Sequence, residues 1–502
     1  MSKVREIEFI TVRDAMDAFK IYIPFIEQHG VNGELITQMI YEHAPVKEQL
    51  KRLRDRYEAS KDGVPILTRE IMSSTGNVIE ASVNNKLNNA YDSDIVDTKN
   101  GYFLGNPINY AVEKNKIAKA DSLISEIDKL RTRDNLPDKD ATLGKRTSIG
   151  GYGARLCYIS LENDKPTPRI TNLKPEEVIF LYKETMAEPR YSLHYYDTVR
   201  LNEKMEKEPV TVADFYDDVR MYRFVRSDSD FVLEDVKIHG FQYNPLFGVE
   251  NNDELDGEAK KILNLVDAFD RTLSDASNEI EASRLAILLL QNIGMDKDDI
   301  EKMKASGILE YFGQDGKASY LTKDVNDSMI ENHLNRLNQN IMRFAKSIDF
   351  TDEKFSSNLS GIAILFKTMG LEHKAIIAEN KMRSSLQYQM KVLCSAWALL
   401  GLCDAEDYLK IYFNFTRNLP ANRKEEAEIV NLLSGQVSQR TLLSYLSTVD
   451  DIEAEIEAMQ QERMEFGAQL PPIEPIGKER ETKVIVADDP DDEDNENLEG
   501  GE

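Results

Sequence analysis

The chain has 502 residues, of which 41% are hydrophobic, and this is enough for two or three domains with cores of their own. Its formal net charge of −27 argues against a protein that holds nucleic acid by neutralising phosphates. Three cysteines without CxxC spacing indicate a reducing compartment, and Cys157, Cys394 and Cys403 are expected to be buried. The mixed charges of the first residues predict no secretory signal, and no apolar run approaches the roughly 20 residues of a membrane span.

The first half of the chain changes from helical to strand-like patterns. Residues 1 to about 60 are predicted to be helical. From Asp92 to about Glu250, short β-type runs are separated by Pro, Gly, Asn and Asp. The clearest runs are Ala154–Ser160, Glu177–Tyr182, Tyr191–Tyr196 and Met221–Val225. Because helical patterns do not alternate with these runs, we expect an α+β domain with an antiparallel sheet.

Two amphipathic helices around a short insert, followed by a polar loop and a still longer helix, dominate the stretch from Leu255 to Leu402. Each helix carries apolar residues at a repeating spacing of three or four. The stripes are Ile262, Val266, Phe269, Leu273, Ala276 and Ile280 in the first helix, Leu334, Leu337, Ile341, Phe344 and Ile348 in the second, and Leu386, Met390, Leu393, Trp397 and Leu400 in the third. The third helix begins near Gly361 and would span about 60 Å, which predicts contacts with other subunits.

The insert and the C-terminal region are less regular. Within the insert, Leu285–Leu290 is a strand-like apolar run, Asp296–Ala305 is a short charged helix, and a second strand pair is expected around Gly313–Gly316. After Cys403 the sequence predicts a β-like run and then two or three short helices. Beyond Gly467 the chain becomes rich in proline and acid, which is typical of a disordered tail.

No motif in the sequence calls for an enzyme. Gly144-Lys145-Arg146-Thr147 lacks the upstream glycine of a phosphate-binding loop, and Gly150-Gly151-Tyr152-Gly153 is interpreted as a turn before a strand. The six histidines have no metal-binding spacing, so neither a metal nor a cofactor is expected. His373 is interpreted as a packed or interface residue of the long helix. The acids from Asp296 to Glu301 lack the order of a calcium loop and predict a charged helix start.

Three local motifs, in this order, resemble the portal proteins of tailed bacteriophages, particularly the family in long-tailed, siphovirus-type phages of Gram-positive bacteria. The first is Asn85-Lys86-Leu87 followed by the run from Ile95 to Ile108. The second is Pro245-Leu246-Phe247 with Asn251-Asn252, and the third is the helix from Leu263 to Ser283. The resemblance covers roughly residues 35 to 465.

This resemblance implies a predominantly helical α+β portal fold that builds a ring. It implies the following regions: an α+β wing at 35–254, a first stem helix at 255–284, an α/β clip at 285–324, a second stem helix at 325–348, a tunnel loop at 349–360, a long helix with a return to the wing at 361–421, and a helical crown at 422–466. The N-terminal segment 1–34 and the acidic tail 467–502 match nothing in the family, so their roles stay open.

The resemblance also implies a function. Twelve copies would form a channel at one capsid vertex of the virion, assembled in the host cytoplasm, through which double-stranded DNA is packaged and ejected. Implied partners are the terminase large subunit, the head–tail adaptor, and the major capsid and scaffolding proteins, with no membrane. Implied site residues are Phe350, Lys354, Phe355 and Asn358 in the tunnel loop, which would meet DNA, and Ile287, Leu288 and Leu289 at the clip interface.

The residues themselves leave other functions open. A non-enzymatic scaffold or adaptor built on long helices has the same stripes, and an enzyme such as a metal-dependent nuclease would need a site that no motif reveals. The acidic balance fits a conduit, since a negative wall lets DNA slide where a basic wall would bind it. The mass of the assembled particle separates a large ring from a monomeric or dimeric scaffold.

Overall fold

The computed structural model describes residues 11–71, 83–162, 164–201, 205–227, 230–283, 287–291, 317–321, 327–349, 361–418, 423–446, 448–449 and 452–465. It divides into two compact units, residues 1–419 and residues 420–502. The fold is mostly helical, and every strand pair in the described residues is antiparallel, as the sequence predicts.

Three N-terminal helices pack on a five-stranded sheet. The helices are α1 (Val12–Ala18), α2 (Tyr22–His29) and α3 (Gly33–Tyr57). The sheet has the order β4 (Val178–Tyr182), β5 (Pro189–Leu201), β6 (Lys207–Tyr216), β7 (Arg220–Ser227) and β8 (Asp230–Ile238). Thr11 and Asn32 cap α1 and α3 by accepting hydrogen bonds from backbone amides at 3.1 and 2.9 Å. Apolar residues of the helices and of alternate strand positions form one buried cluster, so residues 12–29 share the core of this sheet.

Most of the chain from residue 91 to residue 150 is helical, and here the sequence interpretation is wrong. Helices α4 (Tyr91–Leu104), α5 (Ala120–Arg133) and α6 (Leu136–Gly150) occupy the first part of the stretch that was expected to contain mainly strands. In α4 the polar residues Asp92 and Lys99 are buried beside apolar ones, which conceals the helical period. In α5 the buried Leu123, Ile127 and Leu130 do follow that period.

A second sheet positions the start of the helical hairpin. Its order is β3 (Lys165–Leu173), β2 (Tyr152–Glu162) and β9 (Leu246–Glu250), and β9 lies beside residues 152–156 of β2. Gly151 ends α6 at φ 96°, which confirms the predicted turn before β2. Because β9 ends at Glu250, the chain enters the hairpin from the edge of this sheet.

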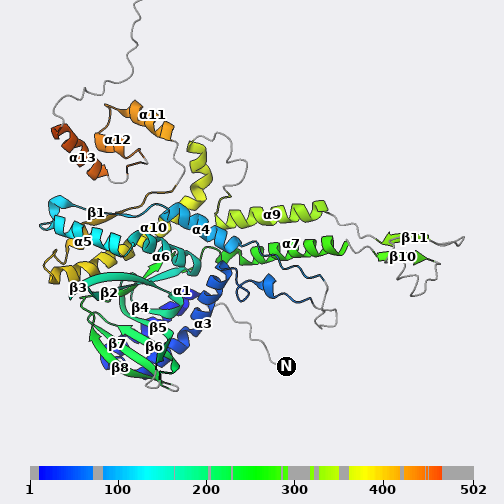
Figure 1. The fold of residues 1–502 in the computed structure, drawn as a ribbon, viewed down its shortest axis with the longest axis horizontal. Coiled ribbons are helices and arrows are strands. Elements are labelled where there is room, and N and C mark those ends of the chain that lie inside the picture. Colours follow the sequence, from blue (N-terminus) through cyan, green and yellow to red (C-terminus); the bar gives the residue numbers. More distant parts are fainter. Residues whose placement is uncertain are drawn as a thin grey trace, which may run out of the picture. The chain divides into compact units, whose positions relative to one another are not determined.

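The hairpin consists of α7 (Leu263–Ser283) and α9 (Asp327–Ala345), which lie side by side and extend away from the two sheets (Figure 1). Between them, β10 (Ile287–Gln291) pairs antiparallel with β11 (Lys317–Leu321). Ile262, Val266, Ile341 and Ala345 form a small core at the base of the hairpin. Both amphipathic helices are therefore confirmed, as is the apolar strand between them. The expected charged helix at 296–305 and the strand pair at 313–316 lie outside the described residues.

The long helix α10 (Gly361–Leu399) is confirmed, and its second half crosses the main core. Leu386, Met390, Leu393 and Trp397 are all buried, as their spacing predicts, whereas Leu400 lies beyond the helix and is half exposed. After the helix, β12 (Ile411–Asn414) pairs with β1 (Asn109–Val112), which confirms the β-like run after Cys403. All three cysteines are buried and free, as expected.

The second unit contains the short helices α11 (Arg423–Leu433), α12 (Gln439–Leu443) and α13 (Ile452–Glu465), which confirms the helices predicted after Cys403. Ser438 caps α12 by accepting a hydrogen bond from the amide of Thr441 at 3.3 Å. Gln439 Nε2 contacts Met459 Sδ at 3.2 Å and links α12 to α13. The expected disordered tail lies outside the described residues.

Candidate functional site at the base of the helical hairpin

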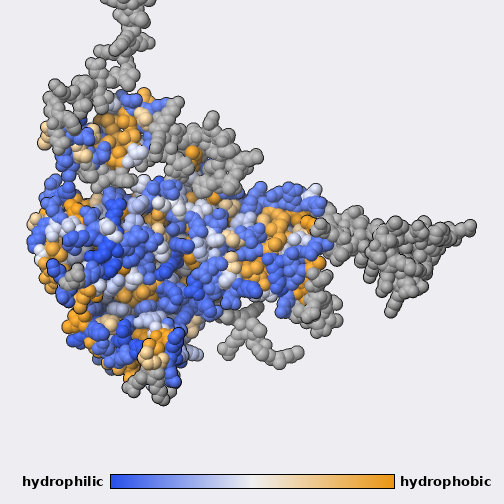
Figure 2. All heavy atoms as spheres, viewed as in Figure 1, coloured by the Kyte–Doolittle hydropathy of each residue, from blue (hydrophilic) through white to orange (hydrophobic). Residues whose placement is uncertain are grey.

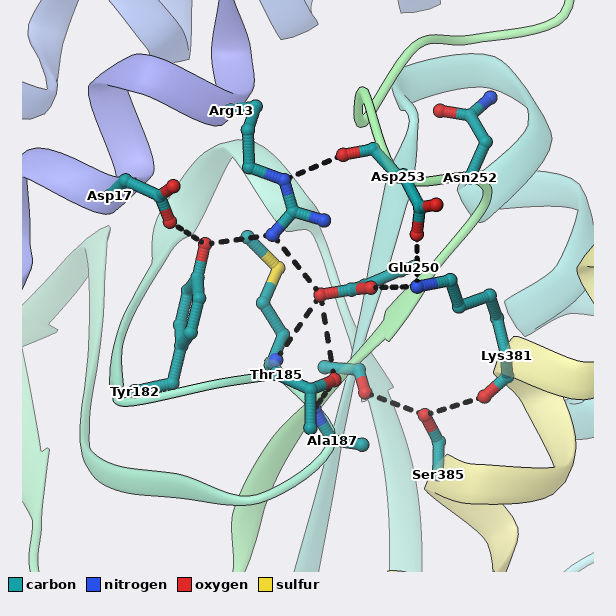
Figure 3. A network of polar contacts seen from close by, with 12 residues as sticks. Arg13, Asp17, Tyr182, Thr185, Ala187, Glu250, Asn252, Asp253, Lys381 and Ser385 are labelled. Atoms are coloured by element: carbon teal, nitrogen blue, oxygen red, sulfur yellow. Dashed lines mark hydrogen bonds and ion pairs between the residues drawn. The ribbon is translucent and has the colours of Figure 1, made fainter.

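The segment that joins β9 to α7, residues 250–258, is called the junction below. The side chain of its first residue, Glu250, is only 3% exposed. It forms ion pairs with two cationic side chains from distant parts of the chain (Figure 3). Arg13 Nη1 of α1 lies 3.4 Å from Glu250 Oε1, and Lys381 Nζ of α10 lies 2.9 Å from Glu250 Oε2. Lys381 also pairs with Asp253 at 2.6 Å, and Arg13 donates to the Asp253 carbonyl at 2.7 Å. These contacts tie α1, the junction and α10 together.

The last residue of the junction, Glu258, is also buried between two cations. Its carboxylate pairs with Lys99 of α4 at 2.7 Å and with Lys374 of α10. Lys99 Nζ further donates to Asn251 Oδ1 at 2.6 Å. Burial works to raise the pKa of Glu258, but the charges of Lys99 and Lys374 outweigh it and lower the pKa to about 2. Lys374 and Lys381 are two turns apart on α10, so one helix face holds both ends of the junction.

The junction is closed by hydrogen bonds within itself. Asn251 Nδ2 and Asn252 Nδ2 both donate to the Asp256 carbonyl at 2.9 Å, and the Asp256 amide donates to Asn252 Oδ1 at 2.9 Å. Leu255 is fully buried and adopts φ 54°, a conformation that costs roughly 1–3 kcal/mol for a residue other than glycine. The surrounding contacts hold this turn, so the junction has a fixed conformation and is not a flexible linker.

Ion pairs of a third buried residue, Arg56, connect α7 of the hairpin to α3 and α4. Arg56 of α3 is 2% exposed and donates from Nε to Asp92 of α4 at 3.1 Å. Its Nη1 donates to Asp267 of α7 at 2.9 Å. Burial works to lower the pKa of Arg56, and the two carboxylates reverse this and raise it. The first turns of α7 are therefore fixed to α3 and α4 through one guanidinium.

Residues 83–90 run along α7 and are called the strap. Alternate strap amides donate to α7 side chains spaced four residues apart. The donor–acceptor distances are 2.7 Å from Asn85 to Asn278, 3.0 Å from Leu87 to Ser274 and 3.0 Å from Asn89 to Asp270. Two extended residues advance about 6.6 Å and four helical residues about 6 Å, so the two repeats match. The strap is thus hydrogen-bonded to polar side chains of α7 from Asp270 to Glu281.

Other faces of the hairpin and of α10 leave large apolar side chains uncovered (Figure 2). Ile280 of α7 and Met329 and Phe344 of α9 are exposed, although Ile280 and Phe344 belong to the predicted stripes. On the first half of α10, the exposed apolar residues lie on one side of the helix: Leu365, Phe366, Met369, Ile376 and Ile377. On the opposite side, Leu371, Ala375 and Ala378 are buried. Exposed apolar surface gathered on one helix face is typical of a protein interface.

The two groups of site residues that the resemblance implies differ in whether the structure describes them. Ile287, Leu288 and Leu289 lie in β10, where they pair with Leu321, Tyr320 and Ser319 of β11. The tunnel-loop residues Phe350, Lys354, Phe355 and Asn358 lie outside the described residues. The sequence analysis used the junction only through Asn251-Asn252, as part of a family motif, and missed its ion pairs. The signal that could have revealed it was the placement of Asn251-Asn252 between two acids, in a motif that carried the family resemblance.

The described part of the chain was expected to hold no metal, and two kinds of feature are absent from it. In the described residues, no group of three or more His, Cys, Asp or Glu side chains could hold a metal ion. Among the helices that the structure describes, none combines the length and apolar character that crossing a membrane requires. His373 is exposed on α10 of the single chain, so the alternative that it packs within its own subunit is wrong.

Comparisons with known proteins agree with this architecture. The chain matches the family described as phage portal protein, SPP1 Gp6-like, over residues 36–466, and it belongs to that family. It is 22% identical over 396 residues to the portal protein of Clostridium phage phiCD119, covering 74% of this chain and 83% of the relative. It is 21% identical over 455 residues to the portal protein of Bacillus phage SPP1, covering 86% of each chain. Both relatives come from phages of Gram-positive hosts, which confirms the predicted resemblance, and a phage portal protein is a capsid-associated oligomer of the virion.

Proposed function

We propose that twelve copies of this chain form a ring at one capsid vertex, and that double-stranded DNA is packaged and ejected through its central channel. The observation that carries this proposal is the α7–α9 hairpin, which is fixed to the body by buried ion pairs and still exposes apolar side chains. A rigid hairpin with an exposed apolar face can pack against the neighbouring copy. When such a head-to-tail interface repeats with a fixed rotation, the copies form a closed ring.

In this proposal, the hairpin helices are the stem and the regions around them take the roles that the resemblance implies. Residues 35–254 are the wing, 285–324 the clip, 349–360 the tunnel loop and 422–466 the crown. The apolar faces of the hairpin and of the first half of α10 are covered by neighbouring copies. Because Lys374 and Lys381 connect α10 to both ends of the junction, a displacement of the stem would reach α10 directly.

The net charge of −27 supports a conduit for DNA. A negative wall repels the phosphate backbone and neutralises no phosphates, so the duplex slides along it and does not bind. In this proposal, the clip, with Ile287, Leu288 and Leu289 in β10, docks the terminase large subunit during packaging and the head–tail adaptor afterwards. The major capsid and scaffolding proteins would contact the ring during assembly in the host cytoplasm. The chain itself catalyses no reaction.

Native mass spectrometry and negative-stain images of the purified chain test the ring. We expect particles with a central channel and a mass near twelve times the 57.3 kDa of one chain. ATP hydrolysis by these particles should not exceed the buffer background. A monomer or dimer at every concentration would instead support the alternative of a helical scaffold or adaptor, and ATP turnover by the pure chain would contradict the non-catalytic role.

Substitution of Lys354 tests the proposed tunnel loop. One cation per subunit, repeated around the ring, would make weak phosphate contacts without holding the duplex, since affinity grows with the number of phosphates neutralised together. Lys354→Glu should leave ring assembly intact and reduce the amount of DNA packaged, measured by packaging assays with the terminase. Lys165→Glu, an equal charge reversal at an exposed position of β3, is the matched control. Full genomes at normal yield in the Lys354 variant would show that this residue makes no important DNA contact.

A further inference from the structure

The end of α10 folds back on itself and brings two cysteines together. Gly401 has φ 74°, its amide donates to the Ala398 carbonyl at 3.0 Å, and the Leu402 amide donates to the Trp397 carbonyl at 2.9 Å. This is the Schellman arrangement of a helix C-terminus, in which a left-handed glycine turns the chain back along the last turns. As a result, Cys403 Sγ lies 3.8 Å from the carbonyl oxygen of Cys394, nine residues earlier.

The two thiols form a pair and the third thiol does not belong to it. Cys403 Sγ donates to the backbone carbonyl of Cys394, and the interaction between the two thiols raises the pKa of Cys394 and lowers the pKa of Cys403. Cys157 is buried in β2, where Arg155 and Asp134 are the charges that influence it. Cys394 and Cys403 are therefore a local pair of reduced thiols, while Cys157 provides an internal comparison of similar burial.

We propose that Cys394 and Cys403 are a redox-sensitive pair that forms a disulfide when the folded chain meets a disulfide oxidant. The bond fastens the end of α10 to the segment that leads into β12. Both sulfurs are buried, but Leu399 and Leu400 on the turn beside them are exposed, so opening of this turn alone uncovers the pair. The interaction with Cys394 favours the Cys403 thiolate most, while burial and the charges of Asp407 and Asp404 oppose it. Lys119, which donates to the Gly401 carbonyl at 2.7 Å, adds a smaller favourable charge.

The reaction is a balanced thiol–disulfide exchange. The Cys403 thiolate attacks oxidised glutathione, and one glutathione thiolate leaves and takes up the proton that Cys403 released. The Cys394 thiol then loses its proton and attacks Cys403 Sγ, which expels the second glutathione as a thiol. The protein pair is oxidised by two electrons, and one glutathione disulfide is reduced to two thiols.

The consequence for the particle rests on the proposed function. A portal made in a reducing cytoplasm holds the pair as thiols, and a virion released into oxidising surroundings acquires the bond. The reduced form would then belong to assembly and packaging, and the oxidised form to the mature particle. The bond closes a short loop at the end of the helix that carries both junction lysines, so it strengthens the anchor of α10.

Peptide mass spectrometry of the full chain tests the pairing. Trypsin cuts after Lys391 and Lys410, so both cysteines fall in one peptide and Cys157 falls in another. The reduced folded chain is incubated with oxidised glutathione, alkylated under denaturing conditions and digested. We expect the 392–410 peptide to lose about two hydrogens and take up no alkylating agent, while the Cys157 peptide is fully alkylated. Two of the three thiols are then lost from a thiol titration.

Three results of this experiment would contradict the redox pair. Glutathione held on Cys403 without an internal bond, alkylation of all three thiols, or links that involve Cys157 would each overturn the proposal. Cys157→Ser should form the internal bond like the unmodified chain, and Cys394→Ser should stop at the mixed disulfide on Cys403. The particle mass is measured on the same samples, so that the redox pair and the ring are tested separately. Rings whose chains keep three free thiols would overturn only the redox pair. A monomer that forms the internal disulfide would overturn only the ring.

Discussion

Replacement of Glu258 with alanine is expected to lower the free energy of unfolding by about 3–5 kcal/mol, because it leaves the buried Lys99 and the partly buried Lys374 without their shared carboxylate. Lys99 is completely buried, and its remaining partners, Asn251 and Ser148, are neutral acceptors. Urea unfolding followed by circular dichroism measures the effect, at equal chain concentrations since assembly also stabilises the fold. Glu254→Ala, an exposed acid in the same junction, should change the stability by less than about 0.5 kcal/mol.

The pH dependence provides a second measurement of the same residue. The pKa of Glu258 is about 2 in the folded chain against an ordinary value of 4.5, so its contribution is complete above pH 4.5. It is lost as the pH falls from 4.5 toward 2, and it amounts to about 3 kcal/mol by linkage. Glu258→Gln should therefore flatten the stability profile in this window relative to the unmodified chain. Parallel profiles for the two chains would show that Glu258 is not held as a carboxylate in the fold.

Replacement of Trp397 with alanine is the second change with a large expected effect, about 3–5 kcal/mol. Trp397 is 1% exposed and lies in the main core with Leu393 and Met390, so its removal leaves a cavity that the rigid α10 cannot close. Circular dichroism measures the loss, because this is the only tryptophan of the chain and the variant has no indole fluorescence.

Leu399 provides the matched control for Trp397. It lies on the last turn of the same helix and is 67% exposed, so Leu399→Ala should change the free energy of unfolding by less than about 0.5 kcal/mol. Its unfolding can be followed through the fluorescence of Trp397. Equal losses in the two variants would mean that the end of α10 is not packed as described.

The long helices could be predicted because their signal is local. Leu386, Met390, Leu393 and Trp397 repeat at helical spacing and are buried together, so periodicity alone located this part of α10. The strand Ile287–Gln291 and the turn at Gly151 were likewise visible as an apolar run and a glycine cluster. In α4, by contrast, buried charges interrupt the apolar pattern, so the helix was missed.

The sequence by itself determined the order of the long helices after residue 255, the buried cysteines and the family, since each depends on neighbouring residues or on motifs in a fixed order. Only the tertiary structure decided which residues form the ion pairs of the junction. Glu250 meets Arg13 and Lys381, and Glu258 meets Lys99 and Lys374, over separations of more than a hundred residues. The sequence shows a glutamate in the same way whether its carboxylate is solvated or buried between two cations. Its role is set by the electrostatics of residues that are distant in the chain and become neighbours only when β9, α4 and α10 pack together.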